Sequence, residues 1–146
     1  MIFLDTSFLF PLFARHDPDH QRVRQVMEGY RGKRMADQVL TTNHVVAETI
    51  TLVRYKGSRE SKAAHALAAE VGRALYAGRL ARIHWSTLED ERAAFEYFER
   101  HADQEYSMVD CLSFVVMEQQ GIREALAVDS DFTHRFLARP GPASYA

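Results

Sequence analysis

Two very short apolar runs, far apart in the chain, each lead into an aspartate. Residues 2–4 (IFL) precede Asp5, and residues 126–128 (LAV) precede Asp129. A short apolar run without polar alternation is typical of a strand that is buried on both faces. Such strands belong to parallel sheets that helices cover on both sides, which constrains this chain to an α/β fold. Because ligands gather at the carboxyl ends of parallel strands, both aspartates are expected at the functional edge of the sheet.

The segments between these runs alternate as a parallel sheet requires. Further short strands are expected at 39–41 and 82–85. Asp17-Pro18 reads as an N-cap followed by proline at the first helical position, which predicts a helix over 18–30. Apolar periodicity predicts further helices at 43–56, 59–77, 87–100 and 108–119.

The chain is expected to form a single domain over residues 1–146. Its length of 146 residues is sufficient to bury a core without disulfides, and no internal repeat is visible. The segment from about residue 138 onward is rich in glycine, proline and small residues, so we expect a loose tail there.

Cysteine usage and hydropathy suggest a cellular location. Cys111 is the only cysteine, which excludes a disulfide within the chain and fits a reducing compartment. No basic leader follows Met1, and no apolar stretch approaches the length that spans a membrane. A cytoplasmic protein without a membrane partner is therefore predicted.

Charge is distributed unevenly along the chain. The formal net charge of −2 argues against a generally basic nucleic-acid binder. However, residues 54–82 carry seven basic side chains against two acidic ones, whereas residues 86–110 carry eight acidic side chains against two arginines. This segregation is compatible with a basic rim that binds a polyanion, and equally with ordinary solvated helix faces.

Four acidic residues stand out by their positions. Asp5 and Asp129 follow strand candidates, and Glu48 lies beside the apolar stripe of the 43–56 helix. Asp110 occupies the first turn of a helix that is otherwise apolar, where an unpaired charge is costly to desolvate. If the fold brought these carboxylates together they would repel one another, and a cation would relieve the repulsion. Oxygen ligands select a hard ion, Mg²⁺ or Mn²⁺.

Each acid also has a purely structural explanation. Asp5 can cap the helix that follows the first strand, and Asp110 can form a capping box with Ser107. Glu48 can pair with a basic residue later in its helix, and Asp129 can form a turn with the next residue. These explanations are each favoured singly, and only the four acids taken together favour a metal site.

The ordered set of acidic segments resembles the four acidic motifs of PIN domains. The matching segments are LDTS at 4–7, TTNHVVAET at 41–49, SMVDCLSF at 107–114 and AVDSDF at 127–132. The segment HDPDH at 16–20 fits the loop before the second helix of VapC-like members. The resemblance covers nearly the whole chain and points to the VapC toxins of type II toxin–antitoxin systems.

This resemblance implies a PIN-like three-layer α/β/α sandwich with a short central parallel sheet. It implies a Mg²⁺- or Mn²⁺-dependent endoribonuclease that hydrolyses RNA phosphodiester bonds and acts as the toxin of a toxin–antitoxin pair. The implied partners are an RNA substrate, a cognate antitoxin protein and a second copy of the chain in a homodimer. The implied metal-binding and catalytic residues are Asp5, Glu48, Asp110 and Asp129, with Thr6, Ser7, Ser107 and Asp131 as possible supporting residues.

Two features depart from the family pattern or leave it ambiguous. PIN domains often carry Thr or Ser two residues before the fourth acid, where this chain has Ala127. The fourth acid itself could be Asp129 or Asp131; Asp129 is preferred because it directly follows the strand candidate and keeps the spacing to Phe132.

Two other functional classes are alternatives to a nuclease: a non-catalytic binding module and a phosphotransfer domain. A catalytically silent PIN-like module could bind RNA or a protein without cutting, but it would not need four acids. A phosphotransfer domain of receiver type also has an acidic pocket on a parallel sheet. That class requires paired acids after the first strand and a lysine after a late strand, which this chain lacks.

Overall fold

The computed structural model describes residues 1–144 and contains one sheet of five parallel strands. In spatial order the strands run β3-β2-β1-β4-β5. Their bounds are β1 Ile2–Leu4, β2 Val39–Thr42, β3 Arg82–His84, β4 Glu124–Ala127 and β5 Leu137–Pro140. The order reverses between β1 and β4, and this switch point is where open α/β sheets bind their ligands.

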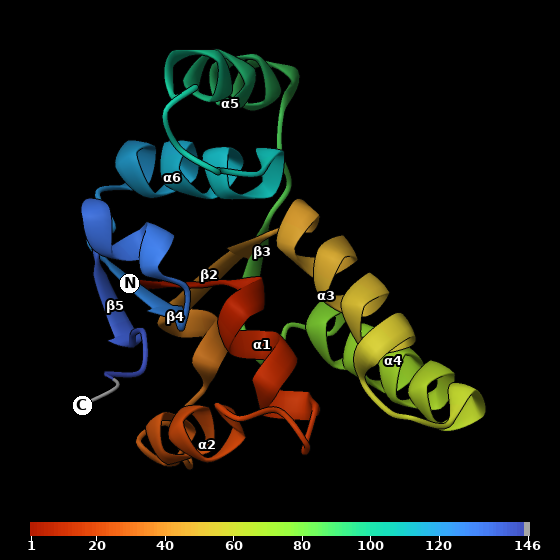
Figure 1. Cartoon of the computed structure of the whole chain (residues 1–146). Helices are drawn as coiled ribbons and strands as arrows, with labels where there is room; N and C mark the ends of the chain where they lie inside the picture. Colours follow the sequence, from red (N-terminus) through yellow and green to blue (C-terminus); the bar gives the residue numbers. More distant parts are fainter. Residues whose placement is uncertain (145–146) are drawn as a thin grey trace.

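Six α-helices and two short 3₁₀ helices connect the strands of the described chain. The α-helices are α1 Thr6–Phe13, α2 His20–Glu28, α3 Asn43–Lys56, α4 Ser61–Tyr76, α5 Leu88–Arg100 and α6 Met108–Gln120. The 3₁₀ helices are η1 Met35–Asp37 and η2 Ser130–His134. Helices α5 and α6 lie together on one side of the sheet, away from α1 and α2, while α3 and α4 form a hairpin that projects sideways (Figure 1). The predicted three-layer α/β arrangement is confirmed.

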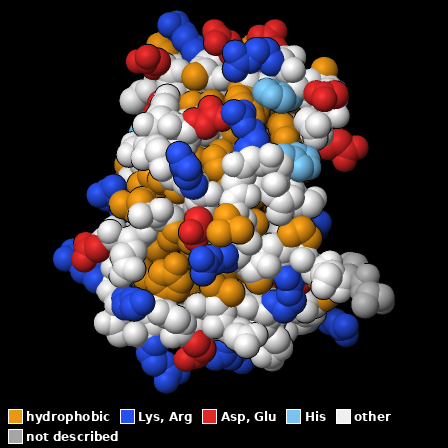
Figure 2. Space-filling view, turned by 90° about the vertical axis from the view of Figure 1, so that its left-hand side faces the viewer, with side chains coloured by type: hydrophobic (Ala, Val, Ile, Leu, Met, Phe, Trp, Pro, Cys, Tyr) orange, Lys and Arg blue, Asp and Glu red, His pale blue; other side chains and the backbone are white. Residues whose placement is uncertain are grey.

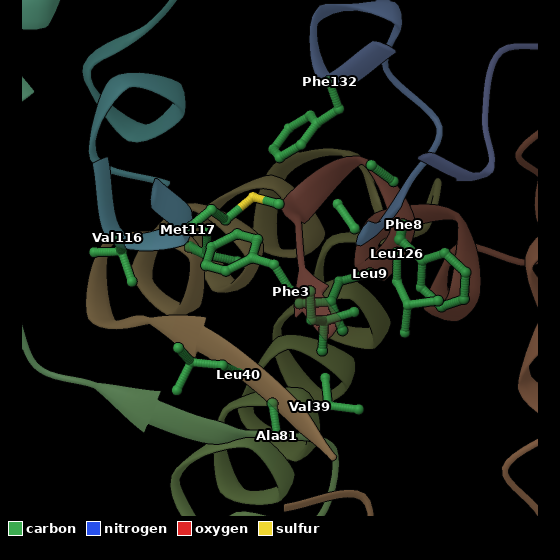
Figure 3. Close-up of a cluster of buried hydrophobic side chains, with 14 of the residues drawn as sticks. Phe3, Phe8, Leu9, Val39, Leu40, Ala81, Val116, Met117, Leu126 and Phe132 are labelled. Atoms are coloured by element: carbon green, nitrogen blue, oxygen red, sulfur yellow. The ribbon is translucent and has the colours of Figure 1, made fainter. Parts of the chain in front are cut away.

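The core forms where apolar side chains from the strands meet helices on both faces. Phe3, Leu40 and Leu126 come from the three central strands and are almost completely buried. On one side they meet α1, and on the other they meet α6, with Phe132 of η2 closing the cluster (Figure 3). This packing holds the carboxyl ends of β1 and β4 at fixed positions, and therefore the residues that follow them.

The C-terminal segment corrects one prediction. Residues from about 138 onward were expected to be loose, but Leu137–Pro140 form the edge strand β5, which pairs with β4 in parallel. The N–H of Gly141 donates to the carbonyl of Ala127 at 3.0 Å, and Arg139 pairs with Glu124 at 3.0 Å. Long-range pairing thus orders a segment whose composition resembles a tail. Residues 145–146 of the predicted tail lie outside the described residues.

The β5 edge ends on a proline and bears few consecutive apolar side chains. Along the face that carries this edge, apolar patches lie between basic and acidic side chains (Figure 2). A short edge strand that ends in proline is a poor template for pairing with another chain. In the described part of the chain, no helix has the length and apolarity that crossing a membrane requires.

Candidate metal-binding active site

One cavity of about 410 Å³ opens at the carboxyl edge of the sheet, and all four predicted acids line it. Asp5 follows β1, Glu48 lies in α3, Asp110 lies in the first turn of α6, and Asp129 follows β4 by two residues. Segments separated by more than a hundred residues are thus brought to one pocket at the switch point of the sheet. The supporting candidates Thr6, Ser7 and Ser107 also line the cavity.

Asp5 is the most buried of these acids, with 3% of its surface exposed. Its Oδ2 accepts a hydrogen bond from the N–H of Ser7 at 2.9 Å and so caps α1. Its Oδ1 is buried and has no hydrogen-bond partner among the residues that the structure describes. A buried carboxylate oxygen without a donor is costly, and it is the kind of ligand that a hard cation satisfies.

The environment of Asp5 favours its protonated form when no cation is present. Burial is the main cause and raises the pKa of Asp5 to about 7, although the hydrogen bonds from Ser7 act in the opposite direction. The nearby charges of Asp110 and Glu48 raise the pKa of Asp5 further. Perturbation of this kind by burial and like charges is common at functional sites.

Asp110 combines a structural role with an unfavourable electrostatic position. It forms a capping box with Ser107: the N–H of Ser107 donates to Oδ2 of Asp110 at 3.0 Å, and the N–H of Asp110 donates to Oγ of Ser107 at 3.1 Å. Burial nevertheless raises the pKa of Asp110 to about 6, with Asp129 and Asp131 contributing in the same direction. The structural explanation from the sequence is thus correct, and it coexists with the acidic cluster.

Ser7 connects the first and fourth acidic segments. Its N–H binds Asp5, while its Oγ accepts from the N–H groups of Val128 and Asp129 at 3.0 and 3.2 Å. A single side chain therefore positions the ends of β1 and β4 relative to each other. Ala127 has no hydroxyl group, but the hydroxyl of Ser7 contacts the loop that carries Asp129.

Asp129 and Asp131 occupy different positions. Asp129 lines the cavity, whereas Asp131 is not among the lining residues. Oδ1 of Asp129 accepts from the N–H of Asp131 at 2.9 Å and caps η2. Burial and the charge of Asp129 raise the pKa of Asp131, and His134 lowers it. Strand β4 ends at Ala127, one residue earlier than predicted, so Val128 lies between the strand and Asp129.

Sequence reasoning missed two acids of this cavity, Asp17 and Asp19. Both belong to the HDPDH segment and lie between α1 and α2. Oδ1 of Asp17 accepts from the N–H of Asp19 at 2.9 Å, and Asp19 pairs with Arg22 at 2.9 Å. The sequence feature that could have pointed to them is the pair of aspartates on either side of Pro18, which the sequence analysis assigns only to a loop and a helix cap.

The carboxylates share a cavity but do not converge on a single point. Within residues 1–144, no three side chains of the types His, Cys, Asp or Glu are close enough together to hold an ion. Asp5 and Asp110 each direct one oxygen to the backbone at the start of a helix, and like charges favour separation. The carboxylate and hydroxyl oxygens of this set suit a hard divalent ion in their chemistry, and Oδ1 of Asp5 has no hydrogen-bond partner among residues 1–144, but these side chains would have to move closer together to bind one.

Comparison with known proteins agrees with this geometry. The model of the PIN domain family matches residues 2–135. The chain belongs to the PIN-domain family. As a PIN domain, it is 35% identical over 134 residues to the 23S rRNA-specific endonuclease VapC20 of Mycobacterium tuberculosis, covering 91% of this chain and 92% of that protein. The predicted resemblance to VapC-type PIN domains is confirmed.

Several solved structures share the architecture. The crystal structure of Mycobacterium tuberculosis VapC20, described as a Sarcin-Ricin loop cleaving toxin, superposes with a TM-score of 0.77 at 33% identity, over 92% of this chain and 94% of that one. FitAcB from Neisseria gonorrhoeae gives a TM-score of 0.61 at 17% identity, over 94% and 96% of the two chains. FitAB bound to an IR36 DNA fragment gives a TM-score of 0.63 at 17% identity, over 94% of this chain and 93% of that one. The two more distant structures support the fold alone.

The roles of Asp129 and Asp131 can be separated by substitution. We expect Asp129→Asn to reduce RNA cleavage at least roughly tenfold, because it removes a charge from the cavity. We expect Asp131→Asn to remain within about threefold of wild type, because its side chain lies outside the lining. Initial cleavage rates with Mn²⁺ present provide the measurement. A larger loss from Asp131→Asn than from Asp129→Asn would reassign the fourth acid.

Proposed function

We propose that this chain is a divalent-metal-dependent endoribonuclease that hydrolyses RNA phosphodiester bonds and acts as the toxin of a toxin–antitoxin pair. The observation that carries the proposal is the shared cavity of Asp5, Glu48, Asp110 and Asp129, where Oδ1 of Asp5 is buried without a hydrogen-bond partner in residues 1–144. A module that only binds RNA or protein would gain nothing from gathering these charges in one cavity and burying Asp5. The whole chain is proposed to be one PIN domain.

Asp5, Glu48, Asp110 and Asp129 would hold Mg²⁺ or Mn²⁺. When bound, such an ion polarises a phosphate oxygen and makes water a better nucleophile at neutral pH. The chain's own contribution is to orient the ligands. Ser7 links Asp5 to the Asp129 loop, and Ser107 fixes Asp110 at the start of α6. An oxygen of Asp5, Glu48 or Asp110 that is not engaged can accept the proton of the attacking water.

The substrate class follows from the relative. VapC20 is named as a 23S rRNA-specific endonuclease and described as cleaving the sarcin–ricin loop. We propose a structured ribosomal RNA of this type as the substrate. We also predict a cognate antitoxin, a homodimer and a cytoplasmic location. The similarity of this chain to VapC20 supports these predictions.

Cleavage of defined RNAs tests the proposed function. Purified protein should cut a 23S rRNA fragment that contains the sarcin–ricin loop when Mg²⁺ or Mn²⁺ is present, and EDTA should abolish the reaction. Asp5→Asn, prepared in parallel, distinguishes the activity from a contaminating nuclease. Equal cleavage by wild type and Asp5→Asn would refute the site. If a panel that also includes transfer RNAs stayed uncut with either ion, the silent binding module would be favoured.

A further inference from the structure

A pair of stacked aromatic side chains is exposed on the surface beside the edge strand β3. The rings of Tyr76 and Trp85 lie nearly parallel, with centroids 6.2 Å apart and an interplanar angle of 17°. Tyr76 ends α4 and Trp85 follows β3 directly. The two residues are 57% and 61% exposed, respectively. Large aromatic side chains left in water carry a cost that a bound partner removes.

Arginines surround this aromatic pair. Arg34, Arg79 and Arg82 line a hollow of about 560 Å³ together with Tyr76 and Trp85. We name these five residues the aromatic platform. Arg34 lies 3.9 Å from Asp37, the one acidic residue that lines the same hollow in the described part of the chain. Within residues 1–144, no carboxylate lies within salt-bridge distance of Arg79 or Arg82. The platform thus presents aromatic faces together with uncompensated positive charge.

Two of the acidic residues that follow β3, Asp90 and Glu91, do not offset this charge, because they are engaged elsewhere. Asp90 binds His84 at 2.8 Å and caps α5 through Thr87. Glu91 accepts from the hydroxyl of Ser86 and contacts His44. Asp90 and Glu91 are therefore tied to their own neighbours.

Trp85 lies at the carboxyl end of β3, whereas Arg34, Arg79 and Arg82 precede or begin β2 and β3 and so lie toward the amino ends of these strands. Trp85 follows the carboxyl end of β3, which is two strand positions from the end of β1 and hence roughly 10 Å from Asp5 along the sheet edge. A groove lined by Asn43, His44 and Glu48 adjoins the acidic cavity through Glu48. Asn43 accepts a hydrogen bond from the N–H of Ser86, the neighbour of Trp85, at 2.9 Å. Contacts through Glu48, Asn43 and Ser86 thus connect the acidic cavity with the neighbour of Trp85.

We propose that the aromatic platform binds unpaired nucleotides that extend the substrate RNA beyond the active site. Bases stack on exposed aromatic faces without strong sequence preference, and unpaired arginines attract the phosphates. A protein partner would also accept Tyr, Trp and Arg, but the excess of guanidinium groups over carboxylates favours a polyanion. This inference rests on the proposed function, because it gives that active site an extended substrate-binding surface.

The test compares two exposed stacked pairs on the same molecule. The test variant is the double substitution Tyr76→Ala with Trp85→Ala. The matched control is Phe95→Ala with Phe98→Ala on α5, whose rings are 6.4 Å apart at 16° and whose side chains are 52% and 44% exposed. A third variant, Arg79→Gln with Arg82→Gln, changes only charge and keeps the test valid if the aromatic variant does not fold.

RNA binding is measured by fluorescence anisotropy in the Asp5→Asn background, with a labelled uridine oligonucleotide of about 12 nucleotides. The platform variant should weaken binding about tenfold, which corresponds to the stacking of one base, while the control leaves it unchanged. The arginine variant should make the dependence of affinity on salt shallower, by roughly one to two in the logarithmic slope. With Asp5 restored, the platform variant should raise KM for the rRNA fragment and leave kcat unchanged.

Several outcomes would overturn the inference. Platform and control variants with equal affinity for the oligonucleotide would show that the aromatic pair is not an RNA surface. A change of molar mass in light scattering caused by the platform variant alone would assign the surface to a contact between copies of the chain. If wild type cleaved no RNA, the proposed nuclease function would fail, but the anisotropy measurement would still decide whether the platform binds RNA.

Discussion

Asp5→Asn is expected to reduce RNA cleavage by at least roughly 100-fold and, at the same time, to stabilise the protein in the absence of divalent ions. The loss of activity follows from removing the most buried negative charge of the cavity. The gain in stability follows from removing the cost of ionising that carboxyl group, whose pKa burial raises from 3.8 to about 7. Asparagine keeps an oxygen that can accept the N–H of Ser7, so the cap of α1 is retained.

The expected size of the stabilisation comes from opposing terms. The shift of the pKa corresponds to about 4 kcal/mol at most, at 1.36 kcal/mol per pKa unit. The asparagine amide would place a buried N–H donor without an acceptor at the position of Oδ1, and such an unsatisfied donor costs about 1–3 kcal/mol. A net increase of about 1–3 kcal/mol in the free energy of unfolding is expected near pH 7.5. Urea unfolding of both proteins in EDTA measures it.

The pH dependence of stability gives an independent check. Between about pH 4 and pH 7 the folded protein keeps the Asp5 proton while the unfolded chain releases it. The free energy of unfolding of wild type should therefore fall as pH rises through this window, and Asp5→Asn should lack that component. Asp103→Asn, at an exposed position, serves as the control and should match wild type. Parallel pH profiles for all three proteins would contradict the assignment of a buried, protonated Asp5.

The strands and helices of the fold were predictable wherever local patterns agree with tertiary packing. Residues 43–56 are helical as predicted, because Thr42 caps the start and an apolar stripe faces the core. Strand β5 was missed because it has no apolar run. Pairing with β4 and the contact between Arg139 and Glu124 hold it in place, and both involve residues distant in sequence.

The identity of the acidic residues was predictable, but their geometry was not. Asp5 and Asp129 were placed at one edge of the sheet because parallel strands end there. The hydrogen bonds from the backbone to Asp5 and Asp110, and the link that Ser7 makes to Asp129, depend on coordinates. Asp17 and Asp19 reach the cavity through the turn between α1 and α2, whose direction no local pattern specifies.

Affinity for Mn²⁺ is expected to rise by roughly 100-fold between pH 5.5 and pH 8. Carboxylates bind a cation in their deprotonated form, so protons compete with the metal. Burial and neighbouring acids raise the pKa of Asp5 to about 7 and that of Asp110 to about 6. At pH 5.5 both groups are mostly protonated, and at pH 8 both are mostly charged. Isothermal titration of wild type with Mn²⁺ at several pH values measures the change.

Substitution of one titrating acid should flatten this dependence and thereby identify its source. Asp110→Asn removes the group whose pKa is about 6. The Mn²⁺ affinity of this variant should therefore depend on pH through Asp5 alone, and the dependence should be shallower below pH 6.5. Asp103→Asn should reproduce the wild-type profile. An ordinary exposed carboxylate is already ionised at pH 5.5, so a site built from such groups would bind Mn²⁺ with almost constant affinity over this range. A flat wild-type profile would therefore show that Asp5 and Asp110 do not bind the ion, whatever the cleavage assays report.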